Sequence, residues 1–484
     1  MKLIWRFIRP HWKLFTLTVL LLVIDVAGSL LIPTLAAQML NLGISAHSFQ
    51  KLIETGLWMA AASLVSGICA ILGGYACAAL SARVGQDMRV AVYDKSLKLS
   101  VYDFRQFGTA SITTRTISDI TNIQMALTSF IQMVLPVPVI IVLAVILTFN
   151  LDVQFGFVLL CAVAAVLILA LFIMRSASPL FRKLQKLLDR MSKILLENIT
   201  GVRVVRAFNN EQREETRLNE SFSSYAKTSI KANRLFANLD GLSFFFINLL
   251  IVVIYWMSGG HISSGILQIG DITAVIEYAM MVLFFIMMAQ MVIMTMPRAL
   301  ECCSRVQNVL DHSPEIVDYV NEDPQIDEKN NQVLAFDHVT FRFADAEEDT
   351  LSDLNFTCRR AQTTAIIGGT GSGKSTVASL ILRFHDVSSG SIRLNGTDIR
   401  DMTQHKLRDH IAYVQQKAWL FSGTIADNLR YSNADASDED LMHAAEVAQA
   451  ADFIRAQPQG LQWHRAGPTS PADRSSVCPS PGRW

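Results

Sequence analysis

The stretch TTAIIGGTGSGKSTVASLILRF, Thr363–Phe384, decides the fold of the second half of this chain. Its opening, TTAIIG, predicts a buried strand, and VASLILRF at its end has the apolar spacing of a helix. Between them, GGTGSGKST fits the pattern GxxxxGK[ST] in the strand, loop and helix order that this pattern requires. The stretch therefore predicts a phosphate-binding loop; the alternative is a glycine-rich turn that binds nothing.

Each part of this loop has an expected role in holding a nucleotide. Glycines let successive backbone N–H groups point at the β-phosphate, and the helix N-terminus adds its dipole. Lys374 would reach the β- and γ-phosphates, while the Ser375 hydroxyl would bind Mg²⁺. The expected contacts of the loop are Gly368, Gly369, Thr370, Gly371, Ser372, Gly373, Lys374, Ser375 and Thr376.

Upstream of the loop, from Val333 onward, the chain has the pattern of a soluble α/β domain. The segments VLAFDHVTFRF and LSDLNFTC alternate apolar and polar residues, which predicts two antiparallel strands. Before them, residues 299–332 indicate a helix followed by a polar linker.

The composition of the whole chain indicates a membrane protein. Hydrophobic residues make up 51% and charged residues 17% of its 484 residues, whereas soluble domains are about 25% charged. The mean hydropathy is +0.33. Because a helix needs about 20 apolar residues to cross the hydrocarbon core, we expect six membrane helices. They lie near residues 14–38, 56–81, 124–149, 153–174, 236–258 and 272–296.

The charges of the connecting segments predict the orientation. The segments 83–123 and 175–235 are long and basic. By contrast, Lys51 is the only Lys or Arg in residues 39–55, and residues 150–152 and 259–271 contain neither. The positive-inside bias then places both termini and the two long segments in the cytoplasm. Helical spacing of apolar residues in the second long segment predicts that membrane helices continue well beyond the bilayer.

The net charge and the cysteine spacing argue against a nucleic-acid partner and against a cysteine metal site. The net charge is zero, so no global field points to nucleic acid as a partner. The seven cysteines have no metal-ligand spacing and are interpreted as reduced packing residues.

The loop, the strands before it and IAYVQQKAWLFSGTIADNLRY, Ile411–Tyr431, resemble the nucleotide-binding domain of ATP-binding cassette (ABC) transporters. This resemblance implies ATP and Mg²⁺ as cofactors. It gives Gln416 the role of a Mg²⁺ and water ligand, although Gln415 replaces the proline that is usual before it. It also implies that Phe343 stacks on adenine, where Tyr is common; the ring face serves equally well in both.

The first half independently resembles the same family. ENITGVRVVRAFNNEQ, GTASITTRTISDI and RALECCSRVQNVLDHSPEI look like the intracellular loops and the linker of ABC exporters that fuse six helices to one cassette. The resemblance covers about residues 1–461 and implies that YDFRQFGTAS and AFNNEQREE are short coupling helices. The alternative for these two segments is solvated loop charge.

The expected fold is thus a multi-domain membrane protein, an all-α six-helix transmembrane domain followed by an incomplete α/β P-loop NTPase (ABC) domain. The expected boundaries are 1–310 for the membrane domain, 311–332 for the linker, 333–461 for the partial nucleotide-binding domain and 462–484 for a tail.

The tail, QWHRAGPTSPADRSSVCPSPGRW, does not look like the chain before it. Codons can be chosen for residues 468–484 that, started two bases later, translate as NFSGGQKQRLSIARAL, the signature segment of ABC cassettes. We therefore expect a frame slip near residues 461–464 and an unfolded, out-of-frame tail. The signature segment, the acidic strand end, the catalytic Glu and the switch His of the family do not occur in these residues.

The implied function is that of an ATP-binding permease subunit of an ABC exporter in the inner or plasma membrane. It would couple ATP binding and hydrolysis to export of a small molecule, lipid or peptide. The implied partners are membrane lipid and a second half-transporter, as a homodimer or a heterodimer. Two alternatives stay open, because the hydrolytic residues are missing: a non-hydrolysing subunit of a heterodimer, or a non-functional fragment.

Polar residues inside the expected spans are candidates for a substrate site. Asp25 and Glu277 are expected to face the bundle interior or a water-filled cavity, because a charge in the bilayer is costly. A structural hydrogen bond or snorkelling is the alternative for each. The methionine-rich segment MMVLFFIMMAQMVIMTM is either an adaptable binding surface or ordinary helix packing.

Overall fold

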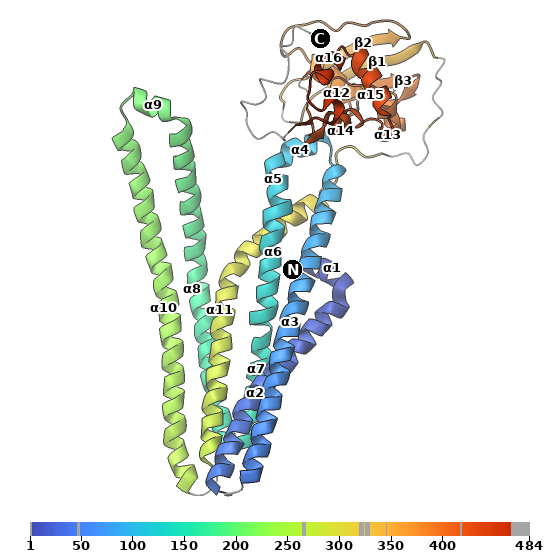
Figure 1. Cartoon of the computed structure of the whole chain (residues 1–484). Helices are drawn as coiled ribbons and strands as arrows, with labels where there is room; N and C mark the ends of the chain where they lie inside the picture. Colours follow the sequence, from blue (N-terminus) through green and yellow to red (C-terminus); the bar gives the residue numbers. More distant parts are fainter. Residues whose placement is uncertain are drawn as a thin grey trace. The chain divides into compact units, whose positions relative to one another are not determined.

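The computed structural model describes residues 2–45, 49–263, 268–318, 324, 330–344, 346–416 and 419–465 (Figure 1). The chain divides into two compact units, and each is described by itself. The first is Met1–Val317 with Phe384–Asp386, and the second is Asp318–Arg383 with Val387–Trp484.

The first unit is built of helices, and all six expected membrane helices are present. Six helical segments of the described chain are long and apolar enough to cross a membrane: Lys2–Leu42, Phe49–Leu97, Thr109–Leu151, Val153–Ile173, Glu211–Gly259 and Ile269–Val292. The helices, with π- and 3₁₀-segments marked η, are α1 Lys2–Ile8, η1 Arg9–His11, α2 Trp12–Ser45, α3 Phe49–Leu97, α4 Val101–Phe107, α5 Thr109–Thr114, η2 Arg115–Asp119, α6 Ile120–Ser129, η3 Phe130–Val134, α7 Pro136–Leu151, α8 Val153–Thr200, α9 Val202–Ala207, α10 Glu211–Ser263 and α11 Ile269–Asp311.

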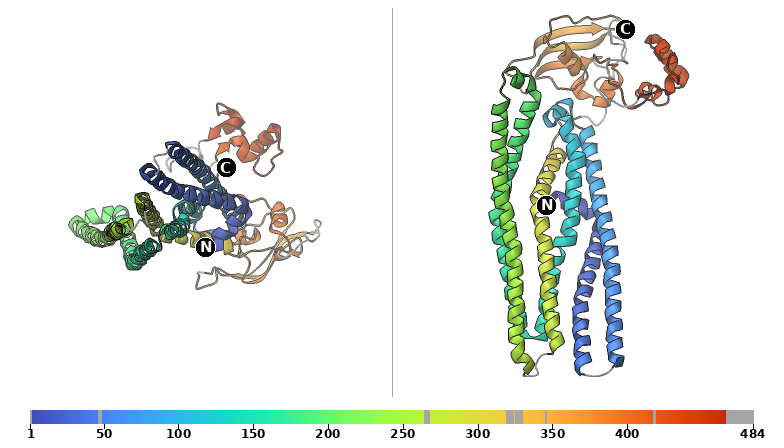
Figure 2. Two further views of the ribbon diagram at one scale, coloured as in Figure 1. Left: turned by 90° about the horizontal axis from the view of Figure 1, so that it is seen from below. Right: turned by 60° about the vertical axis from the view of Figure 1, so that its left-hand side comes forward.

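Several of these helices extend well beyond a bilayer, as the sequence predicts. α10 has 53 residues, about 80 Å of helix, against a hydrocarbon core of about 30 Å. It runs beside α8 along its length, and α9 joins the two at one end (Figure 2).

The two short helices expected at the cytoplasmic turns differ in outcome. α4 overlaps the first expected segment, residues 102–111, and the side chain of Ser100 caps this helix by accepting from the backbone N–H of Asp103. The second expectation, AFNNEQREE, is wrong: α9 ends at Ala207, a turn follows, and α10 starts at Glu211. Asn209 takes a left-handed conformation with φ of 51°, which interrupts the helix at this point.

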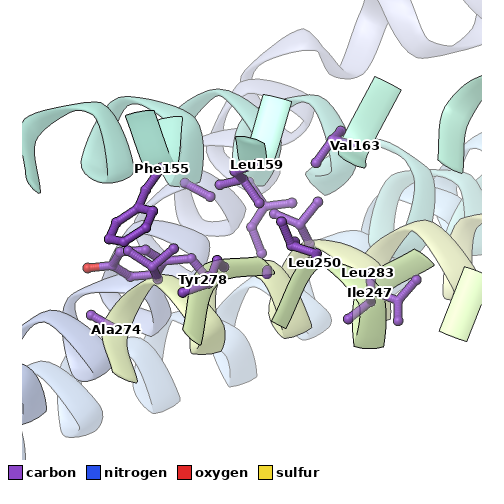
Figure 3. Close-up of a cluster of buried hydrophobic side chains, with 14 of the residues drawn as sticks. Phe155, Leu159, Val163, Ile247, Leu250, Ala274, Tyr278 and Leu283 are labelled. Atoms are coloured by element: carbon purple, nitrogen blue, oxygen red, sulfur yellow. The ribbon is translucent and has the colours of Figure 1, made fainter. Parts of the chain in front are cut away.

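One apolar core of the first unit lies where α8, α10 and α11 meet, and a second joins α3, α6 and α11. Phe155, Leu159, Leu250 and Tyr278 are almost fully buried in one apolar cluster (Figure 3). The Tyr278 hydroxyl lies 2.6 Å from the Thr34 hydroxyl of α2, so the polar end of this buried ring has a partner.

Two buried carboxylates connect distant segments of this unit. Asp119 of η2 accepts two hydrogen bonds from Arg305 of α11, at 2.8 and 2.6 Å. Asp103 of α4 lies 2.7 Å from His312 and accepts from the backbone N–H of Ser100. Burial would raise the pKa of Asp103, but the hydrogen bonds from His312 and Ser100 outweigh it and lower the pKa below its ordinary value.

The second unit contains the expected antiparallel hairpin. β1 Gln332–Phe341 pairs with β2 Leu351–Arg359, with Phe336 opposite Phe356, and the two rings stack at 4.5 Å. β3 Ser389–Leu394 pairs with the other edge of β1, and β4 Thr397–Asp398 continues the sheet in the order β2-β1-β3-β4. One apolar core, which includes Val339, Leu380 and Ile392, lies between this sheet and the helix after the phosphate loop.

The strand expected at TTAIIG is not formed. Residues 363–369 have no strand conformation and all are exposed, with the Ile367 side chain 92% accessible. An apolar run becomes a buried strand only when neighbouring strands and helices cover it, and in the described residues this segment pairs with none of the six strands.

The remaining elements of the second unit are short. They are α12 Lys374–Ile381, η4 Ile399–Asp401, α13 Gln404–Asp409, β5 Gly423–Thr424, α14 Ile425–Leu429, α15 Asp438–Val447, α16 Ala451–Arg455, η5 Gly460–Gln462 and β6 His464–Arg465. β6 pairs with β5, so regular structure continues through residues 462–465, the start of the segment expected as a tail. Residues 466–484, the rest of that segment, lie outside the described residues.

Candidate nucleotide-binding site

The loop Gly368–Gly373 leads directly into α12, and Lys374 is the first residue of that helix. The Lys374 ammonium donates to the carbonyls of Gly368 and Gly369, at 2.9 and 2.5 Å, and to the Ser372 hydroxyl at 3.3 Å. The side chain therefore folds back over its own loop. This places a positive charge at the centre of the predicted phosphate site.

Backbone conformation explains two of the loop glycines. Gly371 and Gly373 have φ values of 87° and 84°, in the left-handed region where a side chain causes strain. A Cβ at Gly373 would also lie 2.6 Å from Leu351 Cδ2 and 3.2 Å from the Thr350 carbonyl. Glycine is thus required at position 373 both by conformation and by the closeness of β2.

The helix start presents a row of free amides. After Ser372, whose N–H donates to Gly369, the next loop or helix amide that has a hydrogen-bond acceptor in the described chain is that of Val377. The N–H groups of residues 373–376 are left over. Unpaired amides at a helix N-terminus attract anions, because they donate directly and lie at the positive end of the helix dipole. This part of the structure fits a phosphate group.

Phe343 belongs to the same neighbourhood through the turn that joins β1 to β2. It is half-buried against the core, and its ring meets that of Phe341 edge to face at 4.8 Å. The turn closes where Thr350 N–H donates to the Phe341 carbonyl, and Thr350 borders Gly373. Thr350, at the end of the turn that contains Phe343, therefore borders the phosphate loop.

The two expected metal ligands, Ser375 and Gln416, are not joined to each other or to the loop by side-chain hydrogen bonds in the described chain. Ser375 and Thr376 lie in the first turn of α12, and the Ser375 side chain is exposed, with no hydrogen bond among the described residues. Gln416 is exposed at the end of an irregular segment, and no hydrogen bond joins it to the loop within the described chain. No group of three or more His, Cys, Asp or Glu side chains that could hold a metal occurs in that part.

Two features of this site were not anticipated from the sequence: a contact made by the expected residue Ser372, and a pair of residues outside the loop. The Ser372 hydroxyl holds the Lys374 ammonium, and Thr350 with Leu351 forms the wall beside Gly373. The first could be inferred from the short spacing along the chain. The second depends on the packing of β2 against the loop, for which the sequence has no local signal.

A bundle of membrane-spanning helices joined in one chain to a domain with a phosphate-binding loop defines a nucleotide-binding membrane protein. The chain belongs to the ABC transporter family, because residues 15–287 match the ABC transporter transmembrane region and residues 351–463 match the ABC transporter domain. It is an exporter of the half-transporter type, with fused membrane and ATP-binding domains.

Relatives of similar organisation come from several bacteria. An uncharacterized ABC transporter ATP-binding protein of Mycobacterium tuberculosis is 29% identical, over 96% of this chain and 79% of the relative. An uncharacterized ABC transporter ATP-binding protein of Bacillus subtilis is 28% identical, over 94% of this chain and 78% of the relative. An ATP-dependent lipid A-core flippase of Thiobacillus denitrificans is 26% identical, over 94% and 78%.

Proposed function

We propose that this chain is one subunit of a dimeric exporter in the cell membrane, with both termini in the cytoplasm, that uses MgATP to move a lipid or another amphiphile outward. The observation that supports it most is the phosphate loop, where four successive amides, residues 373–376, have no acceptor in the described chain and Lys374 lies across the loop. Half-transporters of this family generally act as dimers, so a second copy or a related subunit completes the assembly.

The residues of this chain have separate tasks in this proposal. Phe343 stacks on the adenine ring, Lys374 and the loop amides hold the phosphates, and Ser375 and Gln416 bind Mg²⁺. Bound MgATP supplies the free energy that shifts the membrane helices between their two orientations. The remaining loop residues bind the phosphates through their backbone.

The class of cargo is supported by two facts. Relatives that cover most of this chain include lipid A-core flippases. The membrane helices expose many large apolar side chains, among them Leu64, Phe172 and Trp256, which places a lipid-soluble cargo within reach of the protein surface.

The test is transport by the full chain in inside-out membrane vesicles. A fluorescent lipid analogue should move to the lumenal leaflet when MgATP is added, and should not move with Lys374→Ala. Binding of MgATP without lipid movement or hydrolysis would instead favour a non-hydrolysing subunit. Failure to bind MgATP at all would overturn the proposal.

A further inference from the structure

Glu277 is an acidic residue within a membrane-spanning helix, and no other part of the described chain covers its side chain. It lies on α11, eight residues after Ile269, or about 12 Å into the span. Its side chain is exposed and makes no hydrogen bond or ion pair with any described residue. α11 has no Lys or Arg before Arg298, so no cation is available on its own helix within the span. A carboxylate at this depth costs about 3 kcal/mol or more unless something offsets its charge.

Asp25, the other acidic residue considered for a substrate role, has a different environment. It is half-buried between α2 and α3, and its carboxylate accepts a hydrogen bond of 2.7 Å from the Ser66 hydroxyl. Asp25 therefore fits the structural alternative. Glu277 does not fit this alternative, because it has no hydrogen-bond partner among the described residues. It does not face the interior of its own bundle either, because that side of α11 carries Tyr278, Val282 and Ile286 in the core.

Around Glu277 the uncovered face of α11 carries soft and aromatic side chains. Met280, Phe284 and Met291 are exposed at spacings of three, seven and fourteen residues from Glu277, which puts them on one side of the helix. Phe284 is 61% and Met291 is 66% accessible. An aromatic ring face attracts cations, and methionine adapts to irregular apolar shapes. An uncovered apolar face alone fits lipid; an unpaired carboxylate among these residues favours an apolar ligand with a positive charge.

We propose that the face of α11 formed by Glu277, Met280, Phe284 and Met291 binds the cargo, and that the cargo is a hydrophobic cation such as a lipophilic ammonium or phosphonium. Glu277 pairs with the positive charge, while Phe284 and the two methionines cover the apolar groups. This inference rests on the proposed export function and narrows its cargo. It makes Glu277 a specificity-determining residue.

The experiment uses two probes of the same shape and opposite charge, tetraphenylphosphonium and tetraphenylborate. Each is titrated against the full chain in lipid nanodiscs, with empty nanodiscs as the background. The native chain should bind the cation at least about tenfold more tightly than the anion, because a carboxylate near the site attracts one and repels the other. Glu277→Gln should abolish this preference, and Glu277→Asp should keep most of it.

The matched control is Glu301→Gln, which removes an exposed carboxylate from the same helix beyond its membrane span. This variant should bind both probes as the native chain does. Equal binding of the two probes by the native chain, or an unchanged preference in Glu277→Gln, would overturn the proposal. So would a finding that neither probe binds while Glu277→Gln alters self-association, which would mark the face as a contact between copies.

MgATP binding to the same nanodiscs separates this inference from the proposed function. If Glu277 confers cation preference but MgATP does not bind, the cargo site stands and the ATP-driven role fails. If MgATP binds and Lys374→Ala abolishes it, but no cation preference exists, only the cargo inference fails.

Discussion

Individual residues decide how well the phosphate loop is shaped before any nucleotide binds. Gly373 illustrates this, since it has both a left-handed backbone and a close neighbour in β2. Gly369, in the same loop, has neither: its φ is not in the left-handed region and a Cβ there would meet nothing within 4 Å. The two glycines therefore give a matched pair of substitutions with different expected costs.

We expect Gly373→Ala to lower the free energy of unfolding by about 1–3 kcal/mol, the cost of a strained backbone position, with a further cost from the contact with Leu351. Gly369→Ala should change it by less than about 1 kcal/mol. Thermal unfolding of the full chain in detergent without nucleotide measures both. Equal losses in the two variants would contradict this account of the loop.

The pair Asp103–His312 makes a second prediction at this scale. The folded-state pKa of Asp103 is lowered, so its ionised form stabilises the fold at pH values above the unfolded pKa of about 3.9. This stabilisation is lost as the pH falls through the folded pKa. Asp103→Asn should therefore lower the midpoint of thermal unfolding at pH 6, and by a smaller amount at pH 3.

The control for Asp103→Asn is Asp94→Asn, at an exposed carboxylate of α3 that makes no hydrogen bond or ion pair in the described chain. It should have little effect at either pH. A destabilisation by Asp103→Asn that is the same at pH 3 and pH 6 would show that the charge of Asp103 is unimportant.

At the scale of elements, hydrogen bonds from Arg305 to the buried carboxylate of Asp119 connect α11 to the third membrane segment. Arg305→Met leaves Asp119, which is 2% exposed, without its two hydrogen bonds from the guanidinium. We expect a loss of about 2 kcal/mol in stability, typical of hydrogen bonds to charged groups. Arg298→Met, at an exposed arginine of the same helix without an ion pair in the described residues, should have a small effect. If Arg305→Met/Asp119→Leu is no more stable than Arg305→Met, the loss is not due to the stranded carboxylate.

Elements also show what the sequence could and could not predict. The hairpin of β1 and β2 was predictable, because its alternation of apolar and polar residues is local and its strands are adjacent in the chain. The strand at TTAIIG was predicted wrongly, because burial of Ile366 and Ile367 depends on distant partners that no local pattern reveals. α9 was misplaced by a few residues for a related reason, since the left-handed turn at Asn209 fixes where the helix ends.

The candidate site was predictable to a similar degree. The glycine loop, Lys374 and the following helix have a fixed pattern, so their geometry follows from the sequence. The orientations of Asp25 and Glu277 do not, because a helix that is apolar on all sides gives no sign of which face packs. The same environment was expected for Asp25 and Glu277 from the sequence, whereas in the described residues only Asp25 accepts a hydrogen bond, from Ser66.

At the scale of the whole molecule, the two units carry different parts of one activity. Family membership covers both, with matches to residues 15–287 in the helical unit and 351–463 in the nucleotide-binding unit. The long helices supply a membrane-spanning body, and the phosphate loop supplies the proposed anion site. In the proposed function, ATP binding at this loop is the step on which every later one depends.

The measurement that tests this most directly is equilibrium binding of MgATP to the purified full chain in lipid nanodiscs. The account predicts saturable binding that Lys374→Ala weakens at least about tenfold, because the ammonium makes charge-assisted hydrogen bonds to the phosphates. Lys406→Ala, at a lysine of α13 whose side chain has no ion pair among the described residues, should bind as the native chain does. Saturable MgATP binding that is unaffected by Lys374→Ala, or no binding by the native chain, would contradict the account.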